Sequence, residues 1–326
     1  MNPISPRTLK QTAAQRLSEA AFSPRKLIAL HTGISLAVTL VISLIDYFLS
    51  RQIDNTGGLD GIGLRTILST IQSGLLLAVT IGLPIWSVGF QRAALCYGRK
   101  QPAEPATLLA GFHRFGPVLR LLLLQFLLIC LLLTICTYVG VSIFLITPAA
   151  QTYTEAMLPL MEGLSGMDPN FTLPKETVIV LRESLLPAYA IIGVLFLVAA
   201  IPIFYRIRLA NFAIIDDLRV GAVFATVKSW KLTKGHCLQL FRLDLRFWWF
   251  YGLQFLLTVI PNLLLFLPAI TEGQTILLSL LQSAGQFALF WWAGSYMHTT
   301  YALAYDALQE DFLQAAPAVP KNQPWD

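Results

Sequence analysis

Six long apolar segments, separated by polar or glycine-rich stretches, dominate the pattern of hydrophobic and polar positions along the chain. A helix needs roughly 20 apolar residues to cross the hydrocarbon core of a bilayer, and each segment has about that length. The pattern therefore predicts an all-α integral membrane protein with about six transmembrane helices. The predicted spans are residues 27–49, 66–88, 118–146, 185–204, 247–267 and 276–296, within a membrane domain of residues 27–305.

Two basic, partly amphipathic segments lie between spans, and we expect each to form an interfacial helical hairpin at the cytoplasmic surface. The first contains a short helix over residues 106–115, which we expect Gly116-Pro117 to stop. The second covers residues 205–246 and is predicted to act as a cytoplasmic hinge, with a helix over residues 218–234.

Three further segments complete the predicted organisation. Residues 1–26 carry five basic residues and one acid, which predicts a basic cytoplasmic N-terminal helix. Residues 147–184 form the longest hydrophilic stretch and are predicted to be the main outer loop, holding one helix near residues 155–162. The proline-rich residues 306–326 are predicted to be a disordered cytoplasmic tail.

Composition and charge agree with a membrane protein and assign its orientation. Hydrophobic residues make up 56% of the chain and charged residues only 13%, which does not fit a soluble domain. Of the 23 Lys and Arg residues, 19 fall in the N-terminal segment and in every second segment between spans after it, and 4 fall in the remaining segments. Positive charge is retained on the cytoplasmic side, so both termini are predicted to be cytoplasmic. The expected location is the plasma membrane. Because the basic residues flank apolar spans, anionic phospholipid headgroups are the expected partner, and nucleic acid is not.

Basic and aromatic residues cluster in and beside the hinge. Cations and tryptophans at one depth are typical of contact with phospholipid headgroups or with a partner protein. Ordinary topology determinants, which keep one side of a membrane protein positive, explain the same residues equally simply. The candidate lipid-contacting or partner-contacting residues are Arg206, Arg208, Lys231, Lys234, Trp230, Trp248 and Trp249.

The turns of the hinge hold a second set of candidates. Asp216 or Asp217 is expected to N-cap the helix over residues 218–234, and Gly235 to end it. Asp244 lies between Arg242 and Arg246, where an ion pair within or between helices would explain it. A partner-docking or gating role for this turn is the alternative. The candidate hinge residues are Asp216, Asp217, Ser229, Gly235 and Asp244.

Polar residues inside the predicted spans form a third set, which consists of Asp46, Gln125, Gln254 and Asn262. Asp46 is the one acid within a predicted span, so it either marks an ion or proton route or pairs with Arg51 at the outer interface. The amide side chains, together with those of Gln282 and Gln286, suit hydrogen bonds between helices. A polar transport path is the alternative, with Pro261-Asn262 as its best indicator because a broken helix exposes backbone carbonyls.

Short patterns in three parts of the chain together suggest a family resemblance. The N-terminal part contains Arg7, Leu9, Lys10, Ala13 and Leu17. The hinge has an acidic turn, a serine-containing helix that ends in Lys234-Gly235, and an aromatic start to the next span: Tyr205-Arg206, Phe212, Asp216, Ser229, Leu240-Phe241, Leu243-Asp244-Leu245 and Phe247-Trp248. The C-terminal part contains Tyr296, Tyr301 and Tyr305. These patterns resemble a bacterial membrane family known as Domain of Unknown Function 975, whose name implies no activity.

Motifs of enzymes are not found: the chain contains no phosphate loop, no His-Glu-x-x-His and no Gly-x-Ser-x-Gly, and we assign no catalytic, cofactor-binding or metal-binding residue. The leading hypothesis is a non-catalytic membrane protein that organises lipids or an unidentified membrane protein partner through its basic cytoplasmic face. The alternative is a small-solute transporter or channel, supported by Asp46, Pro261-Asn262 and a weak internal repeat, and a membrane-embedded enzyme is the remote alternative. Convergence of polar residues from different spans on one cavity would separate the first two.

Overall fold

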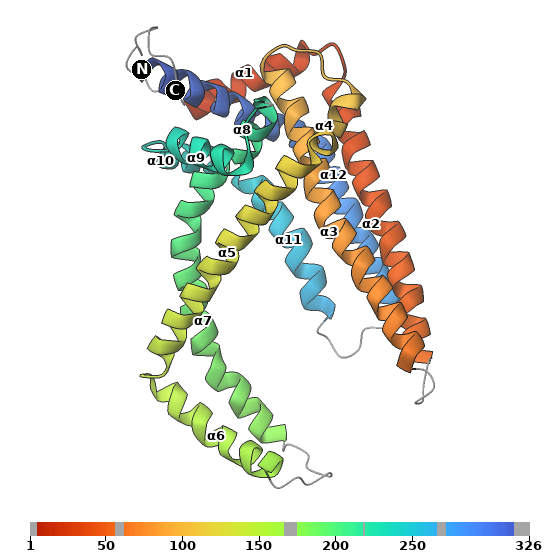
Figure 1. Ribbon diagram of the computed structural model, residues 1–326, viewed down its shortest axis with the longest axis vertical. Coiled ribbons are helices and arrows are strands. Elements are labelled where there is room, and N and C mark those ends of the chain that lie inside the picture. Colours follow the sequence, from red (N-terminus) through yellow and green to blue (C-terminus); the bar gives the residue numbers. More distant parts are fainter. Residues whose placement is uncertain (1–4, 56–61, 166–174, 218, 266–271, 316–326) are drawn as a thin grey trace. The chain divides into compact units, whose positions relative to one another are not determined.

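The computed structural model describes residues 5–55, 62–165, 175–217, 219–265 and 272–315. Helices form almost all of this part of the chain, and it contains no strand. In chain order the helices are α1 (Pro6–Ser18), α2 (Pro24–Asn55), α3 (Ile62–Gly98), the 3₁₀ helix η2 (Pro105–Leu109), α4 (Ala110–His113), α5 (Phe115–Phe144), α6 (Pro148–Ser165), α7 (Lys175–Ile207), α8 (Ala210–Asp216), α9 (Ala222–Leu232), α10 (Cys237–Leu245), α11 (Trp248–Leu265) and α12 (Glu272–Ala315) (Figure 1).

Among the described residues, four helical stretches are long and apolar enough to cross a membrane. They are Pro24–Ile53, Gly63–Gly98, Phe115–Phe144 and Thr177–Asp216, and most of their side chains are not buried inside the protein. Apolar side chains on the outside of a helix of this length suit contact with lipid. The prediction of a helical membrane protein is therefore confirmed at this level. Helices α11 and α12 also occupy the two remaining segments for which the hydropathy predicts spans.

The chain divides into two compact units. Unit 1 combines Met1–Leu122 with Arg208–Asp326, and unit 2 is Leu123–Ile207. In unit 2, α6 packs along α7, and Phe144, Ala150 and Ala188 form a small apolar core. In unit 1, α2, α3 and α12 each pack against the other two, and α11 packs against α12 (Figure 1). Sequence analysis did not predict this division.

One end of unit 1 carries the short helices. The 3₁₀ helix η2 and α4 lie against α3, α1 packs against α10 and α12, α8 packs against α3, and α9 packs against α8 and α12 (Figure 1). We call this group, which consists of α1, η2, α4, α8, α9 and α10, the platform. Segments that are far apart in the sequence, and that the charge distribution predicts to be cytoplasmic, thus meet at one end of the unit.

Two glycines allow the platform to approach α3. A Cβ atom at Gly89 of α3 would overlap the backbone carbonyl of Leu108, and one at Gly111 of α4 would overlap the carbonyl of Ile85. Only glycine fits where two backbones are this close. The predicted helix over residues 106–115 is therefore a pair, η2 and α4, packed onto α3. The prediction that Gly116-Pro117 stops it is wrong, because both residues lie in the first turn of α5, where proline is tolerated.

Two other boundaries differ from the sequence-based expectations. The outer loop predicted over residues 147–184 is largely helical, because α6 fills its first half and α7 begins at Lys175. The helix expected near residues 155–162 lies within α6. The tail predicted to be disordered from residue 306 is helical as far as Ala315, where Leu308 is buried and Asp306 is bound by Arg99. Residues 316–326 lie outside the described part.

Candidate functional site

The platform is held to α3 by an arginine between two carboxylates. Arg99 follows the last turn of α3, and its Nη2 lies 2.6 Å from Oδ1 of Asp306 on α12, while its Nε donates to both oxygens of the same carboxylate at 3.1 and 3.2 Å. Its Nη1 donates to Asp216 at the end of α8. The hydrogen bonds with Asp306 and then Asp216 raise the pKa of Arg99 above its ordinary value, so the guanidinium stays charged.

Tyrosine completes this first cluster. The Tyr305 hydroxyl on α12 donates to the second oxygen of Asp216 at 3.2 Å, and its ring stacks on Phe212 of α8 with centroids 5.8 Å apart. Burial raises the pKa of Tyr305, and the neighbouring Asp216 raises it further, which keeps the hydroxyl protonated as a donor. Asp216 thus has both oxygens satisfied, as a half-buried carboxylate requires.

A second cluster joins the beginning of the hinge to α10. Arg208 Nη1 donates to Oδ2 of Asp244, and the side chains of both residues are only 14% exposed. The guanidinium lies over the ring of Tyr301, 4.0 Å from its centroid, and Nη2 donates to the Tyr251 hydroxyl at 3.2 Å. Tyr301 donates to the other oxygen of Asp244. Both oxygens of this carboxylate are therefore paired as well.

Helix α12 brings the two clusters together. Tyr301 and Tyr305 are four residues apart, so they lie on one face of α12, one turn from each other. Tyr301 binds the carboxylate of α10, Tyr305 binds that of α8, and Asp306 binds the arginine that follows α3. The C-terminal part of α12 therefore fixes three other elements by charge-assisted contacts, each stronger than a neutral hydrogen bond.

Two more arginines bind the C-terminal end of α8. Arg92 of α3 donates to the carbonyl of Ile215 at 3.2 Å. Arg114, which precedes α5, donates to the carbonyls of Ile214 and Asp217, the latter at 2.9 Å. The last carbonyls of a helix have no partner within the helix and carry partial negative charge, so cations stabilise them. Helix α8 is short, and these contacts supply the hydrogen bonds that its own backbone cannot.

Helix α1 is anchored through Lys10. Its Nζ lies 3.5 Å from the carbonyl of Arg246, which follows α10, and 4.6 Å from the centroid of the Phe247 ring. Burial lowers the pKa of Lys10 below its ordinary value, and the charge of Arg246 lowers it further. A second contact joins Glu19 to Lys100, whose charged atoms are 2.9 Å apart and well exposed. The surface pair adds little, so Lys10 carries the polar part of the docking.

The outward face of α9 is apolar. Its buried residues lie along one stripe of the helix: Ala222, Ala225, Ser229 and Leu232. The opposite stripe consists of Val223, Val227 and Trp230 at helical spacing, with Phe224 beside it, and all four are exposed. Leu238 and Phe241 on α10 and Trp248 on α11 continue this exposed apolar surface. A soluble protein would normally turn such residues inward.

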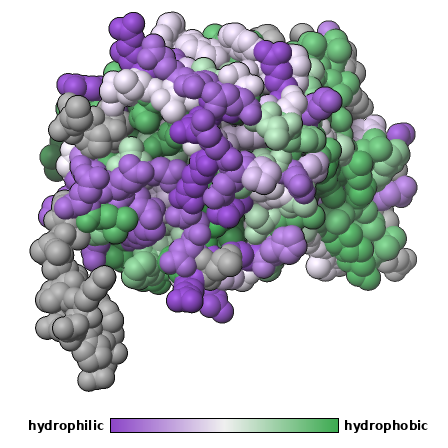
Figure 2. Space-filling model, turned by 90° about the horizontal axis from the view of Figure 1, so that it is seen from above, coloured by the Kyte–Doolittle hydropathy of each residue, from purple (hydrophilic) through white to green (hydrophobic). Residues whose placement is uncertain are grey.

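Basic residues predominate among the exposed charges beside this apolar face, although Asp217 at the end of α8 is exposed as well. Between residues 219 and 246, every charged residue that is exposed is Lys or Arg: Arg219, Lys231, Lys234, Arg242 and Arg246. The one acid of this stretch, Asp244, is half-buried and paired within the second cluster. Figure 2 shows hydrophilic residues over the middle and left of the face that is seen from above, and hydrophobic residues mainly along its right side.

A family model described as "Protein of unknown function (DUF975)" matches residues 5–311. The chain belongs to this family. The matched range runs from the residue before α1 almost to the end of α12, so it includes both units and the whole platform. No curated protein and no solved structure matches the chain. Family membership confirms the resemblance seen in the sequence, and the family description assigns no activity.

The predicted lipid-contacting residues have different surroundings. Lys231, Lys234, Trp230 and Trp248 are exposed, as contact with a headgroup requires. Trp249 packs against Trp292 of α12, with ring centroids 5.0 Å apart. Arg208 is bound within the second cluster, so its charge is used inside the protein. Arg206 is half-buried and belongs to unit 2.

The predicted hinge residues have mainly structural contacts. The prediction that Asp216 or Asp217 N-caps the next helix is wrong, because α9 begins after Gly221 without a side-chain cap and Asp217 ends α8. Asp216 instead binds Arg99. Gly235 follows α9 with a φ of +84°, a left-handed conformation that suits glycine. Ser229 is fully buried. Asp244 forms an ion pair with Arg208, which confirms one of the two interpretations of this residue.

The described polar residues of the predicted spans lie in separate places and do not form one cluster. Gln72 of α3 donates to Asp46 of α2 at 2.7 Å, so the described partner of Asp46 is Gln72. The space beside this pair is too small to hold a water molecule. Gln125 of α5 lies in unit 2, Gln254 of α11 lies in unit 1, and both are half-buried. The side chain of Asn262 lies outside the described residues.

Sequence reasoning did not identify the residues that bind Asp216 and Asp244 in the two clusters. Arg99 and Arg114 were counted only as topology determinants, and Asp306 was placed in the tail. Tyr301 and Tyr305 entered only through the family resemblance. Their spacing of four on one helix, close to the C-terminus, was a signal for a shared face, but nothing in the local pattern identified the partners.

Proposed function

We propose that the chain is a non-catalytic membrane organiser that holds anionic phospholipid headgroups against its platform. In this proposal six helices span the plasma membrane, both termini are cytoplasmic, and the platform lies at the inner surface. The observation that carries it is the outward face of α9 and α10, where apolar and aromatic side chains are exposed beside charges that are mainly basic. That combination is typical of helices that lie in a membrane interface.

The internal clusters support the same proposal. The acids Asp216 and Asp244 are paired inside the protein, so the outward charges meet anionic headgroups without competition from these carboxylates. Each Lys or Arg at an anionic surface contributes about 1 kcal/mol, and the exposed basic residues add up to selective attraction. The clusters also fix α8 and α10 to α3 and α12, which holds the basic side chains in one arrangement.

Lipid selectivity tests the proposal directly. The purified chain is placed in nanodiscs of phosphatidylcholine with a minor share of phosphatidylglycerol, and the lipids that remain bound are measured by native mass spectrometry. The variant Lys231→Gln with Lys234→Gln is expected to lose roughly 30-fold in preference for phosphatidylglycerol, at about 1 kcal/mol for each charge. Unchanged retention in this variant would overturn the proposal.

The matched control is Arg65→Gln. Arg65 is also exposed and basic, but it lies near the beginning of α3, far from the platform in sequence and on the side predicted to be outside. This variant is expected to retain phosphatidylglycerol as the parent does. Recovery of a stoichiometric membrane protein in place of lipid, released by the same double substitution, would transfer the role from lipids to a partner protein.

The proposed topology has its own test. In a variant whose four cysteines are replaced by serine, Lys234→Cys and Arg65→Cys each introduce one exposed thiol. A membrane-impermeant thiol reagent added to intact cells is expected to label position 65 but not position 234, and to label both after lysis. Labelling of position 234 in intact cells would contradict a cytoplasmic platform.

The transport alternative has one supporting observation, because polar side chains of α2, α3 and α12 converge on a cleft within unit 1. Gln286, one of the amides considered for a polar path in the sequence, lines that cleft, whereas Asp46, Gln125 and Gln254 do not. Flux of small neutral solutes into proteoliposomes tests this alternative. Flux that falls in Asp46→Asn would favour transport, and the closed packing of Asp46 with Gln72 argues for no effect.

A further inference from the structure

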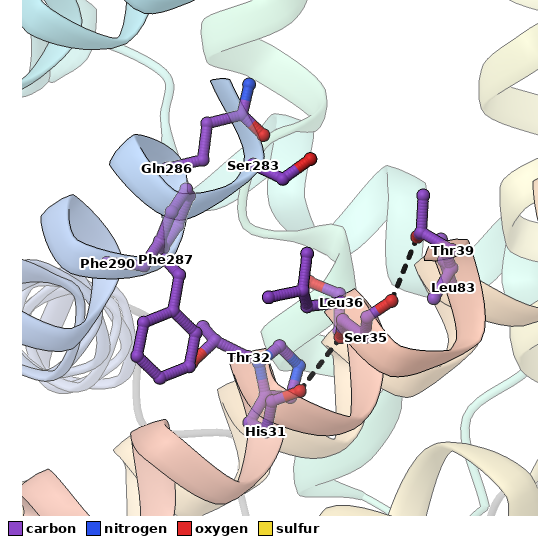
Figure 3. Close-up of a pocket in the computed structure, with 11 residues that line it drawn as sticks. His31, Thr32, Ser35, Leu36, Thr39, Leu83, Ser283, Gln286, Phe287 and Phe290 are labelled. Carbon is purple, nitrogen blue, oxygen red and sulfur yellow. Dashed lines mark hydrogen bonds between the residues drawn. The ribbon is translucent and has the colours of Figure 1, made fainter. Parts of the chain in front are cut away.

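A cleft of about 310 Å³ lies among α2, α3 and α12 of unit 1 (Figure 3). Most of its lining side chains are half-buried and Thr39 is exposed, so the cleft is open rather than enclosed. The lining residues of α2 and α3 belong to stretches that are long and apolar enough to cross a membrane. A volume near 300 Å³ is at the lower end of the range for ligand pockets.

The hydroxyl groups on α2 present acceptors to this cleft. Ser35 Oγ donates to the carbonyl of His31 and Thr39 Oγ1 donates to the carbonyl of Ser35, each at 2.9 Å (Figure 3). Thr32 donates in the same way to the carbonyl of Ile28 at 2.7 Å. A hydroxyl has one proton, so these oxygens have lone pairs left but no proton to offer. A hydrogen bond to these three hydroxyl oxygens therefore needs a donor from the ligand.

The opposite side of the cleft comes from α12. Ser283 and Gln286 lie across the cleft from the α2 residues, and Phe287 and Phe290 form an apolar part beside them (Figure 3). The Gln286 amide supplies both a donor and an acceptor. A ligand that suits both parts carries a small polar group next to an apolar body.

His31 adds a rigid ring to the lining. Its ring stacks on Trp86 of α3 with centroids 5.5 Å apart, and Phe90 lies 4.9 Å away, so the imidazole is held in place. Its Nε2 is buried and has no hydrogen-bond partner among the described residues. That atom is out of contact with solvent although the cleft is open, so the imidazole supplies a fixed wall and not a polar contact to an occupant.

Charge excludes most membrane lipids from the cleft. No Asp, Glu, Lys or Arg is among the residues that line it in the described part of the chain. A phosphate or an ammonium group would enter without a counter-charge, and burying an unpaired charge is strongly unfavourable. An uncharged group with hydroxyl donors meets no such penalty.

We propose that this cleft binds the glycerol end of an uncharged, hydroxyl-bearing lipid of the diacylglycerol class. The single free hydroxyl donates to the Oγ of Ser35, and the Gln286 amide donates to an ester carbonyl. Phe287 and Phe290 contact the first carbons of the acyl chains, whose remainder stays in the bilayer. The proposal concerns a different surface and a different lipid from the anionic headgroups of the platform.

Photolabelling of the full chain tests the proposal. The chain in nanodiscs of phosphatidylcholine alone is exposed to a diacylglycerol with a photoreactive group near the glycerol, and labelled peptides are mapped by mass spectrometry. Saturable labelling of α2 and α12, displaced by unlabelled diacylglycerol, is the expected result. Labelling that does not saturate, or that phosphatidic acid displaces equally well, overturns the proposal. Because the saturation and diacylglycerol-displacement measurements use no anionic lipid, their result does not depend on the platform.

Single substitutions sharpen the test. Ser35→Ala and Gln286→Leu each remove one hydrogen-bonding group and are expected to weaken labelling about threefold to tenfold. Ser73→Ala is the matched control, because Ser73 donates to a carbonyl of its own helix at 2.8 Å but is exposed on α3 outside the cleft. Equal effects of Ser35→Ala and Ser73→Ala would overturn the proposed contact. Displacement in the unaltered chain decides the question should a variant fail to fold.

Discussion

The Arg208 guanidinium and the Asp244 carboxylate, 36 residues apart in the chain, form an ion pair in which each side chain is 14% exposed. The Tyr301 hydroxyl donates to the carboxylate, and the guanidinium lies over the Tyr301 ring. The pair connects the first residue of the hinge in unit 1 to α10. It therefore fixes α10, which carries part of the exposed aromatic and basic surface.

Asp244→Asn is the first prediction. The amide keeps the shape but leaves the Arg208 charge without a counter-charge, and losing one partner of a largely buried pair is expected to cost on the order of 3 kcal/mol. The midpoint of thermal unfolding in detergent measures the effect. Glu310→Gln, at an exposed position of α12, is expected to change stability by less than about 0.5 kcal/mol. Native stability in Asp244→Asn would show that the ion pair does not hold α10 in place.

The second prediction concerns coupling between Arg99 and Asp306. These residues share three hydrogen bonds, so Arg99→Gln and Asp306→Asn are expected to be non-additive, with an interaction energy of about 1–3 kcal/mol in a double-mutant cycle. Arg99→Lys should recover little, because an ammonium cannot reproduce the planar fork that reaches both Asp306 and Asp216. Additive effects would show that the pair does not connect α3 to α12.

The third prediction compares glycines within one helix. Gly89→Ala places a Cβ against the Leu108 carbonyl and is expected to destabilise the protein by about 1–3 kcal/mol or more, because a backbone must move. A Cβ added at Gly74 of the same helix would meet no atom within 4 Å beyond its own helix backbone and chain neighbours. Gly74→Ala should therefore be neutral or stabilising by up to about 1 kcal/mol. Thermal unfolding of the two variants decides between packing and helix propensity.

The fourth prediction uses the extent of α12. A chain that ends at residue 305 loses Asp306 and the buried Leu308, so its platform is expected to loosen, with faster proteolysis between α8 and α10. A chain that ends at residue 315 keeps both contacts and is expected to resist protease as the full chain does. Equal resistance of the two truncated chains would contradict a structural role for the end of α12.

The fifth prediction concerns alkaline pH. Burial raises the pKa of Tyr301 and of Tyr305 above the ordinary value of about 10. A pKa that is higher in the folded state contributes stability that is present below the unfolded pKa and is lost as pH rises through the folded one. Stability should therefore fall with pH above about 10, and Tyr301→Phe with Tyr305→Phe should flatten that fall. Ultraviolet absorbance of tyrosinate, measured against pH, follows ionisation in the parent chain and in the double variant. An unchanged slope in the double variant would assign the fall to other groups.

Much of the architecture was predictable because membrane spans are a local property. The backbone must satisfy its own hydrogen bonds in lipid, so about 20 consecutive apolar residues predict a helix from sequence alone. All six predicted spans are helical in the described residues, and four meet the length and hydropathy of a span. Helix ends were less predictable. Aspartate is a favoured N-cap residue, but Asp216 lies at the end of the preceding helix, where it binds Arg99.

The candidate site was predictable only in part. The exposed Lys231, Lys234, Trp230 and Trp248 followed from the clustering of basic and aromatic residues. The same clustering did not separate them from Arg208, because exposure depends on whether a distant acid lies nearby. The cleft also escaped prediction, since Ser35, Ser283 and Gln286 are ordinary polar residues in spans until three helices place them together.

The sequence by itself determined that the chain is helical, apolar enough for a membrane, and basic on alternate segments, because each of these depends on residues close together along the chain. Only the tertiary structure decided which charges are neutralised inside the protein and which face outward. Arg99 meets carboxylates 117 and 207 residues away. Such pairing depends on how helices pack, and the local period of apolar residues carries no information about which distant side chain will neutralise a given charge.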